Sequence, residues 1–141
     1  MKKDIEFEYA DPWLLLSIIY AKIHGESTLA NIIGYGDFIN HAVFSLEELQ
    51  GGLFRLIRSG YVIDNDKEFL PTDKISVPYE KFTKKKNPVN KELQFIRVEL
   101  NAPEWSDSYD PVKANKSGSY SKINQESFES AYKEYAQKMK I

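Results

Sequence analysis

Residues 45–72 read SLEELQGGLFRLIRSGYVIDNDKEFLPT, and this stretch decides the fold class. Ser45 and Glu48 have the S-x-x-E spacing of a capping box, in which each side chain accepts the backbone N–H of the other residue. Apolar residues then recur at helical spacing until Gly60, a good helix stop. Short apolar runs follow on both sides of residues 64–66, which favour a turn. The stretch therefore predicts a capped helix followed by a β-hairpin.

The chain before this stretch predicts two helices. Asp11 is a good N-cap, and Pro12 suits the first turn because its missing N–H has no partner there. This first helix is apolar nearly all round up to Gly25, so it should be buried on several sides. A second helix should begin at Ser27 or Thr28, and all three helices should share one core.

The chain after the hairpin predicts further helices and a loop. A short helix is expected over residues 73–83 and an amphipathic one over residues 89–100. Residues 101–123 are polar and predict a long, partly mobile loop. Residues 124–141 should form a last helix that packs on its own domain or on another subunit. We therefore expect a mainly α protein with a small β-hairpin, in which residues 1–100 form the main domain.

Composition excludes several classes of protein. The absence of cysteine excludes disulfides and thiolate metal sites. The N-terminus, MKKDIEFEYADPW, lacks the apolar region of a signal peptide. The longest apolar run, Trp13–Leu16, is far shorter than the roughly 20 residues of a membrane span. We expect a cytoplasmic protein without membrane association.

No catalytic or cofactor motif stands out. Residues 34–36, Gly-Tyr-Gly, lack the full spacing of a phosphate-binding loop and follow no predicted strand. Asp37 and His41 have i, i+4 spacing, and with His24 they are candidates for a metal or acid–base site, but no further ligand is visible. The alternative is that both histidines are ordinary hydrogen-bonded or exposed residues. We expect no enzymatic activity, no cofactor and no metal.

Four stretches carry a family resemblance: Thr28-Leu29, residues 46–59, residues 60–62 and residues 69–72. They resemble winged-helix regulators of the MarR and PadR types. In that order, they correspond to the threonine-leucine start of the second helix, the recognition helix, the glycine that ends it, and the end of the wing. Residues 33–44, IGYGDFINHAVF, are also similar to small uncharacterised bacterial proteins of this architecture.

The resemblance covers residues 11–100 and implies a winged helix-turn-helix fold with additional C-terminal helices. It also implies a DNA-binding or transcription-regulator-like protein that works as a homodimer on double-stranded DNA. Residues 89–100 or the last helix would supply the dimer contact. The alternative function is a winged-helix module that binds a protein partner instead of DNA.

Charge is unevenly distributed along the chain. Residues 1–50 hold eight acidic residues and three lysines, whereas residues 74–97 hold seven basic and two acidic residues. Such asymmetry is typical of a side that faces nucleic acid, although a lysine run is also common in a solvated loop. The candidate phosphate contacts are Arg55, Arg58, Lys67, Lys84, Lys85 and Lys86.

The helix that would read DNA is nevertheless poorly suited to it. Its N-terminal half supplies Glu47 and Glu48, and carboxylates are repelled by phosphates. The hairpin turn at residues 64–66 is also acidic, where regulators of this type usually place Arg or Lys. These features favour the protein-binding alternative.

Three aromatic residues stand in the polar loop: Trp105, Tyr109 and Tyr120. Large aromatic side chains usually bury most of their surface, and they are also frequent anchors of protein interfaces. These residues should therefore fold back over the domain or dock onto a partner.

Overall fold

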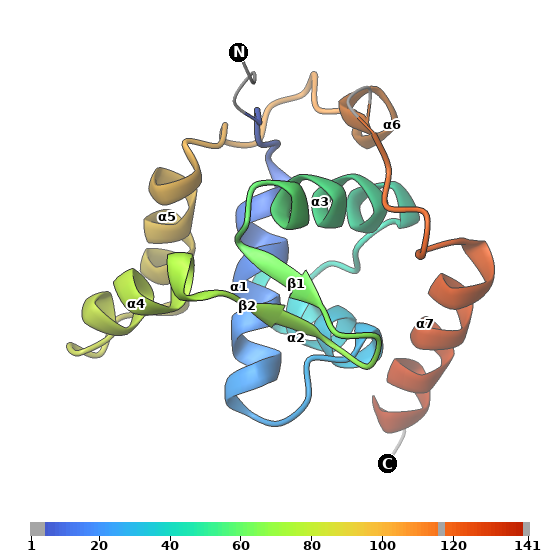
Figure 1. Ribbon diagram of the computed structural model, residues 1–141, viewed down its shortest axis with the longest axis horizontal. Coiled ribbons are helices and arrows are strands. Elements are labelled where there is room, and N and C mark those ends of the chain that lie inside the picture. The colour runs from blue at the N-terminus through green and yellow to red at the C-terminus, as the bar shows by residue number, and fades with distance from the viewer. Residues whose placement is uncertain (1–4, 116–117, 140–141) are drawn as a thin grey trace.

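A computed structural model describes residues 5–115 and 118–139, and helices dominate it (Figure 1). The elements in chain order are α1 (Ala10–Ile23), α2 (Leu29–Asn40), α3 (Leu46–Arg58), β1 (Val62–Asp64), β2 (Phe69–Pro71), α4 (Asp73–Phe82), α5 (Val89–Leu100), α6 (Pro111–Ala114) and α7 (Gln125–Met139). The two strands pair antiparallel, with Ile63 opposite Leu70. The predicted class, mainly α with a small β-hairpin, is confirmed. None of the helices in the described part of the chain combines the length and apolar character that a membrane crossing requires.

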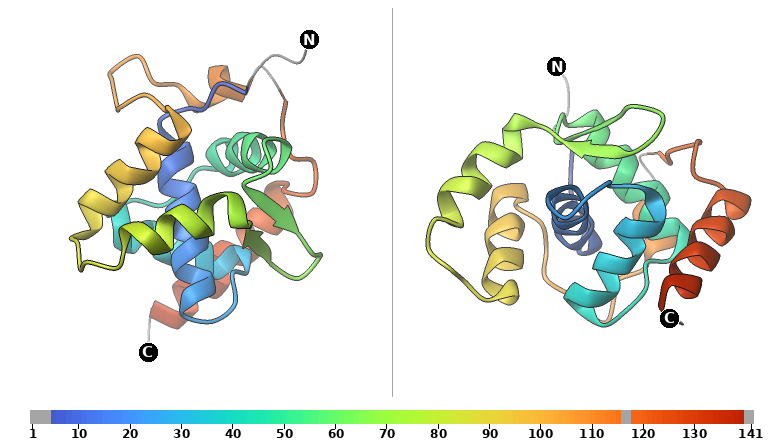
Figure 2. Two further views of the ribbon diagram at one scale, coloured as in Figure 1. Left: turned by 60° about the vertical axis from the view of Figure 1, so that its left-hand side comes forward. Right: turned by 90° about the horizontal axis from the view of Figure 1, so that it is seen from below.

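Helix α1 lies at the centre of the molecule, and the other elements surround it (Figure 2). Most of its residues are buried, as expected for a helix that is apolar nearly all round. Helix α3 packs against it through Leu49, Leu53 and Leu56, which have no exposed surface. The predicted common core of the first three helices is therefore confirmed.

The capping box at the start of α3 is also confirmed. Ser45 Oγ accepts the Glu48 N–H at 3.1 Å, and Glu48 Oε1 accepts the Ser45 N–H at 2.9 Å. Thr28 caps α2 in a similar way, because its Oγ1 accepts the Asn31 N–H. Both helix starts thus follow from local sequence.

The start of α1 differs from the expectation, because Asp11 is not its N-cap. The N-cap is Tyr9, two residues earlier, and Asp11 lies fully buried in the first turn. Its carboxylate binds the guanidinium of Arg55 and accepts the Glu8 N–H. A charge-assisted bond to a buried arginine is stronger than a solvated cap, so the tertiary partner determines the position of Asp11.

Helices α4 and α5 form a hairpin that lies beside α1 (Figure 2). The hydroxyls of Tyr20 and Tyr79 both donate to Glu92 Oε1 at 2.7 Å, which joins α1, α4 and α5 at one carboxylate. The rings of Phe82 and Phe95 stack with centroids 4.5 Å apart. This hairpin presents the turn that carries the lysine run.

Helix α7 packs on its own domain, beside α2. The Tyr135 hydroxyl donates to Asp37, and Lys138 Nζ donates to Asn31 Oδ1 at 3.0 Å. A Cβ at Gly34 would approach the Tyr135 ring to 3.1 Å, so this glycine permits close packing. Of the two predicted positions for the last helix, this structure has the intramolecular one.

Candidate nucleic-acid interface

The predicted phosphate contacts are dispersed over the molecule. Lys84, Lys85 and Lys86 are exposed at the turn between α4 and α5, and Lys67 is exposed at the turn between β1 and β2. Figures 1 and 2 place these two turns at opposite sides of the protein. They do not belong to one continuous basic face.

Arg55 is buried rather than available to DNA. Only 3% of its surface is exposed, and its guanidinium binds the Asp11 carboxylate through Nε at 2.6 Å and Nη2 at 3.0 Å. Its Nη1 donates to the Ala114 carbonyl at 3.0 Å. Burial raises the pKa of Asp11, and the guanidinium partly offsets that rise. The prediction that Arg55 contacts phosphate is therefore wrong, because its donors are engaged inside the protein.

Helix α3, all of which is described, exposes only Arg58 at its C-terminal end. The Arg58 guanidinium lies over the Phe54 ring, 5.7 Å from its centroid. A helix that reads a DNA groove presents its N-terminal half and one exposed face to the bases. In this structure that half is covered.

The cover is a segment that we call the arm, residues 109–115 and 118–123. It passes the N-terminal end of α3 before it joins α7 (Figure 1). Its hydrogen bonds to α3 are Asn115 Nδ2 to the Glu47 carbonyl at 2.9 Å, Tyr109 OH to Glu48 Oε2 at 2.9 Å, Tyr120 N–H to the Gln50 carbonyl at 2.9 Å, Gln50 Nε2 to the Ile123 carbonyl at 2.8 Å, and the bond from Arg55 Nη1 to the Ala114 carbonyl at 3.0 Å.

Two glycines allow the arm to lie this close to α3. A Cβ at Gly51 would lie 1.7 Å from Asn115 Oδ1, so the Asn115 side chain, which binds the Glu47 carbonyl, could not keep its position. Gly118 has a φ of +146° and faces the Phe54 ring, to which a Cβ would approach within 2.5 Å. A glycine inside a helix costs about 1 kcal/mol relative to alanine, so Gly51 was a sequence signal of close packing. The sequence did not show what packs there.

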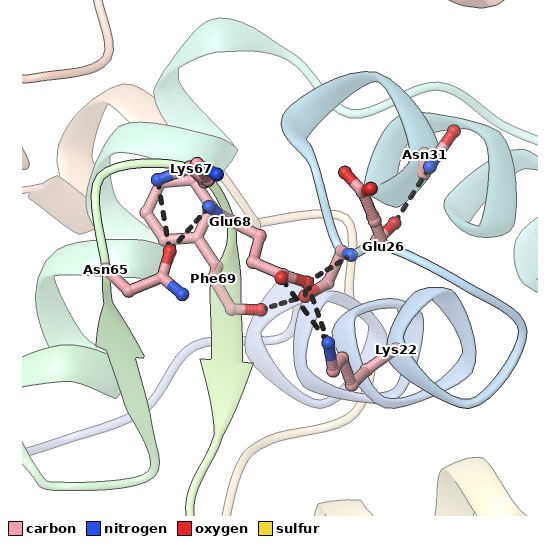
Figure 3. A network of polar contacts seen from close by, with 8 residues as sticks. Lys22, Glu26, Asn31, Asn65, Lys67, Glu68 and Phe69 are labelled. Carbon is pink, nitrogen blue, oxygen red and sulfur yellow. Dashed lines mark hydrogen bonds and ion pairs between the residues drawn. The ribbon is translucent and has the colours of Figure 1, made fainter.

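The β-hairpin is anchored from two sides, first by the connection between α1 and α2 (Figure 3). Glu68 Oε1 accepts the Ser27 N–H at 2.9 Å and Lys22 Nζ at 3.1 Å, and the Phe69 N–H donates to the Ser27 carbonyl at 3.0 Å. Asn65 Oδ1 closes the turn by accepting the Glu68 N–H.

The arm anchors the other side of the hairpin. The Tyr120 hydroxyl donates to Asp64 Oδ2 at 2.6 Å, and Lys122 Nζ lies 3.2 Å from Asp64 and 2.6 Å from Asp66. Burial and the Asp64 carboxylate raise the pKa of Tyr120 to about 12, so the hydroxyl stays protonated and donates. Burial opposes ionisation of Asp64, but its hydrogen bonds, led by the one from Tyr120, lower its pKa overall.

Of the three loop aromatics, two take the predicted position over the domain. Tyr109 and Tyr120 fold back over the domain as part of the arm, where each is half-buried. Trp105 is 60% exposed. The candidate metal residues take separate roles: Asp37 accepts the Tyr135 hydroxyl, His41 is exposed and caps α2, and His24 stacks on Tyr35.

Comparisons of the chain with known proteins find no matching family model, curated protein or solved structure.

Proposed function

We propose that this protein is a non-enzymatic winged-helix module that binds another protein through α3 and the β-hairpin. One observation carries the proposal: this surface is acidic and already holds a polypeptide segment, the arm. Glu48, Asp64 and Asp66 receive tyrosine hydroxyls and a lysine ammonium, which are groups that a protein ligand supplies. A phosphate backbone would meet the same carboxylates with repulsion.

A labelled DNA duplex at low salt tests this proposal. We expect no duplex binding that depends on α3, so Arg58→Ala should leave the fluorescence anisotropy of the duplex unchanged. Arg58 is the informative position because it is the exposed cation of this helix. Saturable duplex binding that Arg58→Ala weakens contradicts the proposal.

A second candidate function, non-specific DNA binding, is favoured by the turn between α4 and α5. Lys84, Lys85 and Lys86 are exposed there, and within the described part of the chain they form no ion pair. Duplex binding lost on replacing all three with alanine, with a salt slope lowered by about 0.9 per contact, supports this candidate. Lys133→Ala on α7, at an exposed position, is the control, to be compared with the single variant Lys85→Ala, which removes the same charge from the turn.

A further inference from the structure

The arm covers α3 with few buried apolar contacts. Among the described arm residues, only Ile123 is buried, at 4% exposure; the tyrosines are half-buried and Lys122 is exposed. Leu49 and Leu53 of α3, by contrast, have no exposed surface and belong to the core cluster. Segments with few buried apolar contacts open locally at a small fraction of the cost of global unfolding. Ile123 is the one described arm residue that belongs to the buried core cluster, so release of the arm exposes this side chain and leaves the buried leucines of α1 and α3 packed together.

The connection before the arm, residues 101–108, can lengthen when the arm moves. Residues 101–108 are mostly exposed, and a turn closed by the Tyr109 N–H on the Ser106 carbonyl shortens them. Extended chain spans up to about 3.3–3.6 Å per residue, so opening this turn lengthens the connection. Arg55 loses one bond when the arm leaves, the one to Ala114, and keeps both bonds to Asp11.

The contacts of the arm define what else this surface can hold. Three of them use backbone groups of the arm and accept any extended peptide: Tyr120 to Gln50, Gln50 to Ile123, and Arg55 to Ala114. The remaining acceptors, Glu48 and Asp64 above all, select hydroxyl and ammonium donors. A small residue is needed over the Phe54 ring.

We propose that the arm occupies, in the same chain, the docking surface for an extended segment of a partner protein that carries tyrosine and basic residues. This inference rests on the proposed function, and it adds the regulation of the surface and the chemistry of the partner. A tethered segment has an effective concentration near the millimolar range. The arm of a second copy would make the same contacts, but at micromolar concentration it does not displace the tethered arm of the same chain. A more basic segment gains contacts to the carboxylates of α3 and the hairpin and displaces the arm.

A labelled peptide with the sequence of residues 109–123 tests the proposal on the full chain. The released variant combines Tyr109→Phe, Tyr120→Phe and Lys122→Ala, which removes arm groups and leaves the receiving surface intact. We expect the peptide to bind this variant about tenfold or more tightly than the wild type, because each charge-assisted bond removed from the arm favours the open state. Adding Asp64→Asn to the released variant should weaken peptide binding, and a wild-type thermal midpoint for the core confirms folding.

A locked variant gives the complementary test. The variant combines Gly51→Cys and Asn115→Cys, so that a disulfide can join α3 to the arm. A Cβ at position 51 would lie 2.6 Å from Asn115 Cγ, and the natural chain has no cysteine that could compete. We expect the oxidised variant to bind no peptide and reduction to restore binding to the wild-type level or above.

The outcomes separate the two proposals. Faster amide exchange at Tyr120 in the released variant, without peptide binding, overturns this inference and leaves the arm as a structural cover. A dimer of the released variant in sedimentation overturns the choice of partner, because a second copy then fills the surface. Duplex binding gained on release, and weakened by Arg58→Ala, overturns the proposed function itself.

Discussion

The two faces of α3 are covered by different means. The inner face buries leucines against α1, and Leu53 and Leu56 have no exposed surface. The outer face is covered by the arm, which is held on α3 by hydrogen bonds, on the β-hairpin by Tyr120 and Lys122, and in the core by Ile123 alone among its described residues. Apolar burial contributes about 25 cal/mol to the free energy of unfolding for each Å² removed from water, so separating the buried leucines from α1 is costly. A partly exposed hydrogen bond contributes only about 1 kcal/mol, so each polar contact of the arm is easily broken. The same helix thus belongs to the core on one side, while on the other it carries the cover that we propose to be reversible.

Asp11→Ala tests the residue that joins both faces, and we expect the largest effect from it. The change leaves the Arg55 guanidinium buried without its carboxylate, which costs about 3–5 kcal/mol. Urea denaturation followed by circular dichroism measures the loss. Asp107→Ala, at an exposed loop position, is the matched control and should change stability by less than about 0.5 kcal/mol. A small effect of Asp11→Ala would show that water solvates Arg55.

Leu53→Ala tests the inner face alone. The leucine has no exposed surface, so its truncation should cost about 2–5 kcal/mol through lost burial and a cavity. Val112→Ala in the arm, at a position 65% exposed, is the control and should be nearly neutral. Equal losses for the two variants would refute the contrast between the faces.

Ser45→Ala tests the N-terminal cap of α3, a local hydrogen bond that involves neither the inner nor the outer face of the helix. Removing the side-chain acceptor leaves the Glu48 N–H without its cap and should cost about 0.5–2 kcal/mol. Ser121→Ala, on the exposed part of the arm, serves as the control. An unchanged denaturation midpoint for Ser45→Ala would mean that the capping box adds nothing to the stability that packing supplies.

Tyr120→Phe tests the outer face. We expect a global loss of about 1 kcal/mol or less, because the bond to Asp64 is only part-buried. Hydrogen exchange should nevertheless be faster at the arm amides of Tyr120 and Ile123, with unchanged protection at Leu53. If core and arm amides accelerate together, the arm does not open independently.

Low pH should weaken the contact between the arm and the β-hairpin, and we expect this to be the smallest of the effects predicted. The pKa of Asp64 is below its ordinary value of 3.8 in the folded protein, so the ionised carboxylate stabilises the arm above that pH. This stabilisation is lost as the pH falls below 3.8 and through the lowered pKa. Exchange at Tyr120, corrected for its intrinsic pH dependence, should increase in that range. Asp64→Asn removes the dependence, while Glu68, whose pKa is also lowered, bonds to Ser27 and not to the arm.

The elements that sequence predicted well are those set by local signals. The capping box at Ser45, the Thr28 cap and the helix over residues 89–100 were found where expected, because caps and apolar periodicity act within one or two helical turns. The candidate interface was predicted less well. Arg55 has the charge and the N–H donors of a phosphate contact, but its role depends on Asp11, which lies 44 residues away in the chain.

The sequence by itself determined the helical class, the hairpin, the glycine pair inside α3 and the acidic character of the surface that α3 and the hairpin share. Only the tertiary structure decided that the arm, residues 109–115 and 118–123, lies across that surface, that Asp11 pairs with Arg55, and that α7 rests on α2. The physical reason is the range of the interactions. Periodicity and caps are encoded by neighbours, whereas a hydrogen bond between Tyr109 and Glu48 joins residues 61 positions apart and has no local signature.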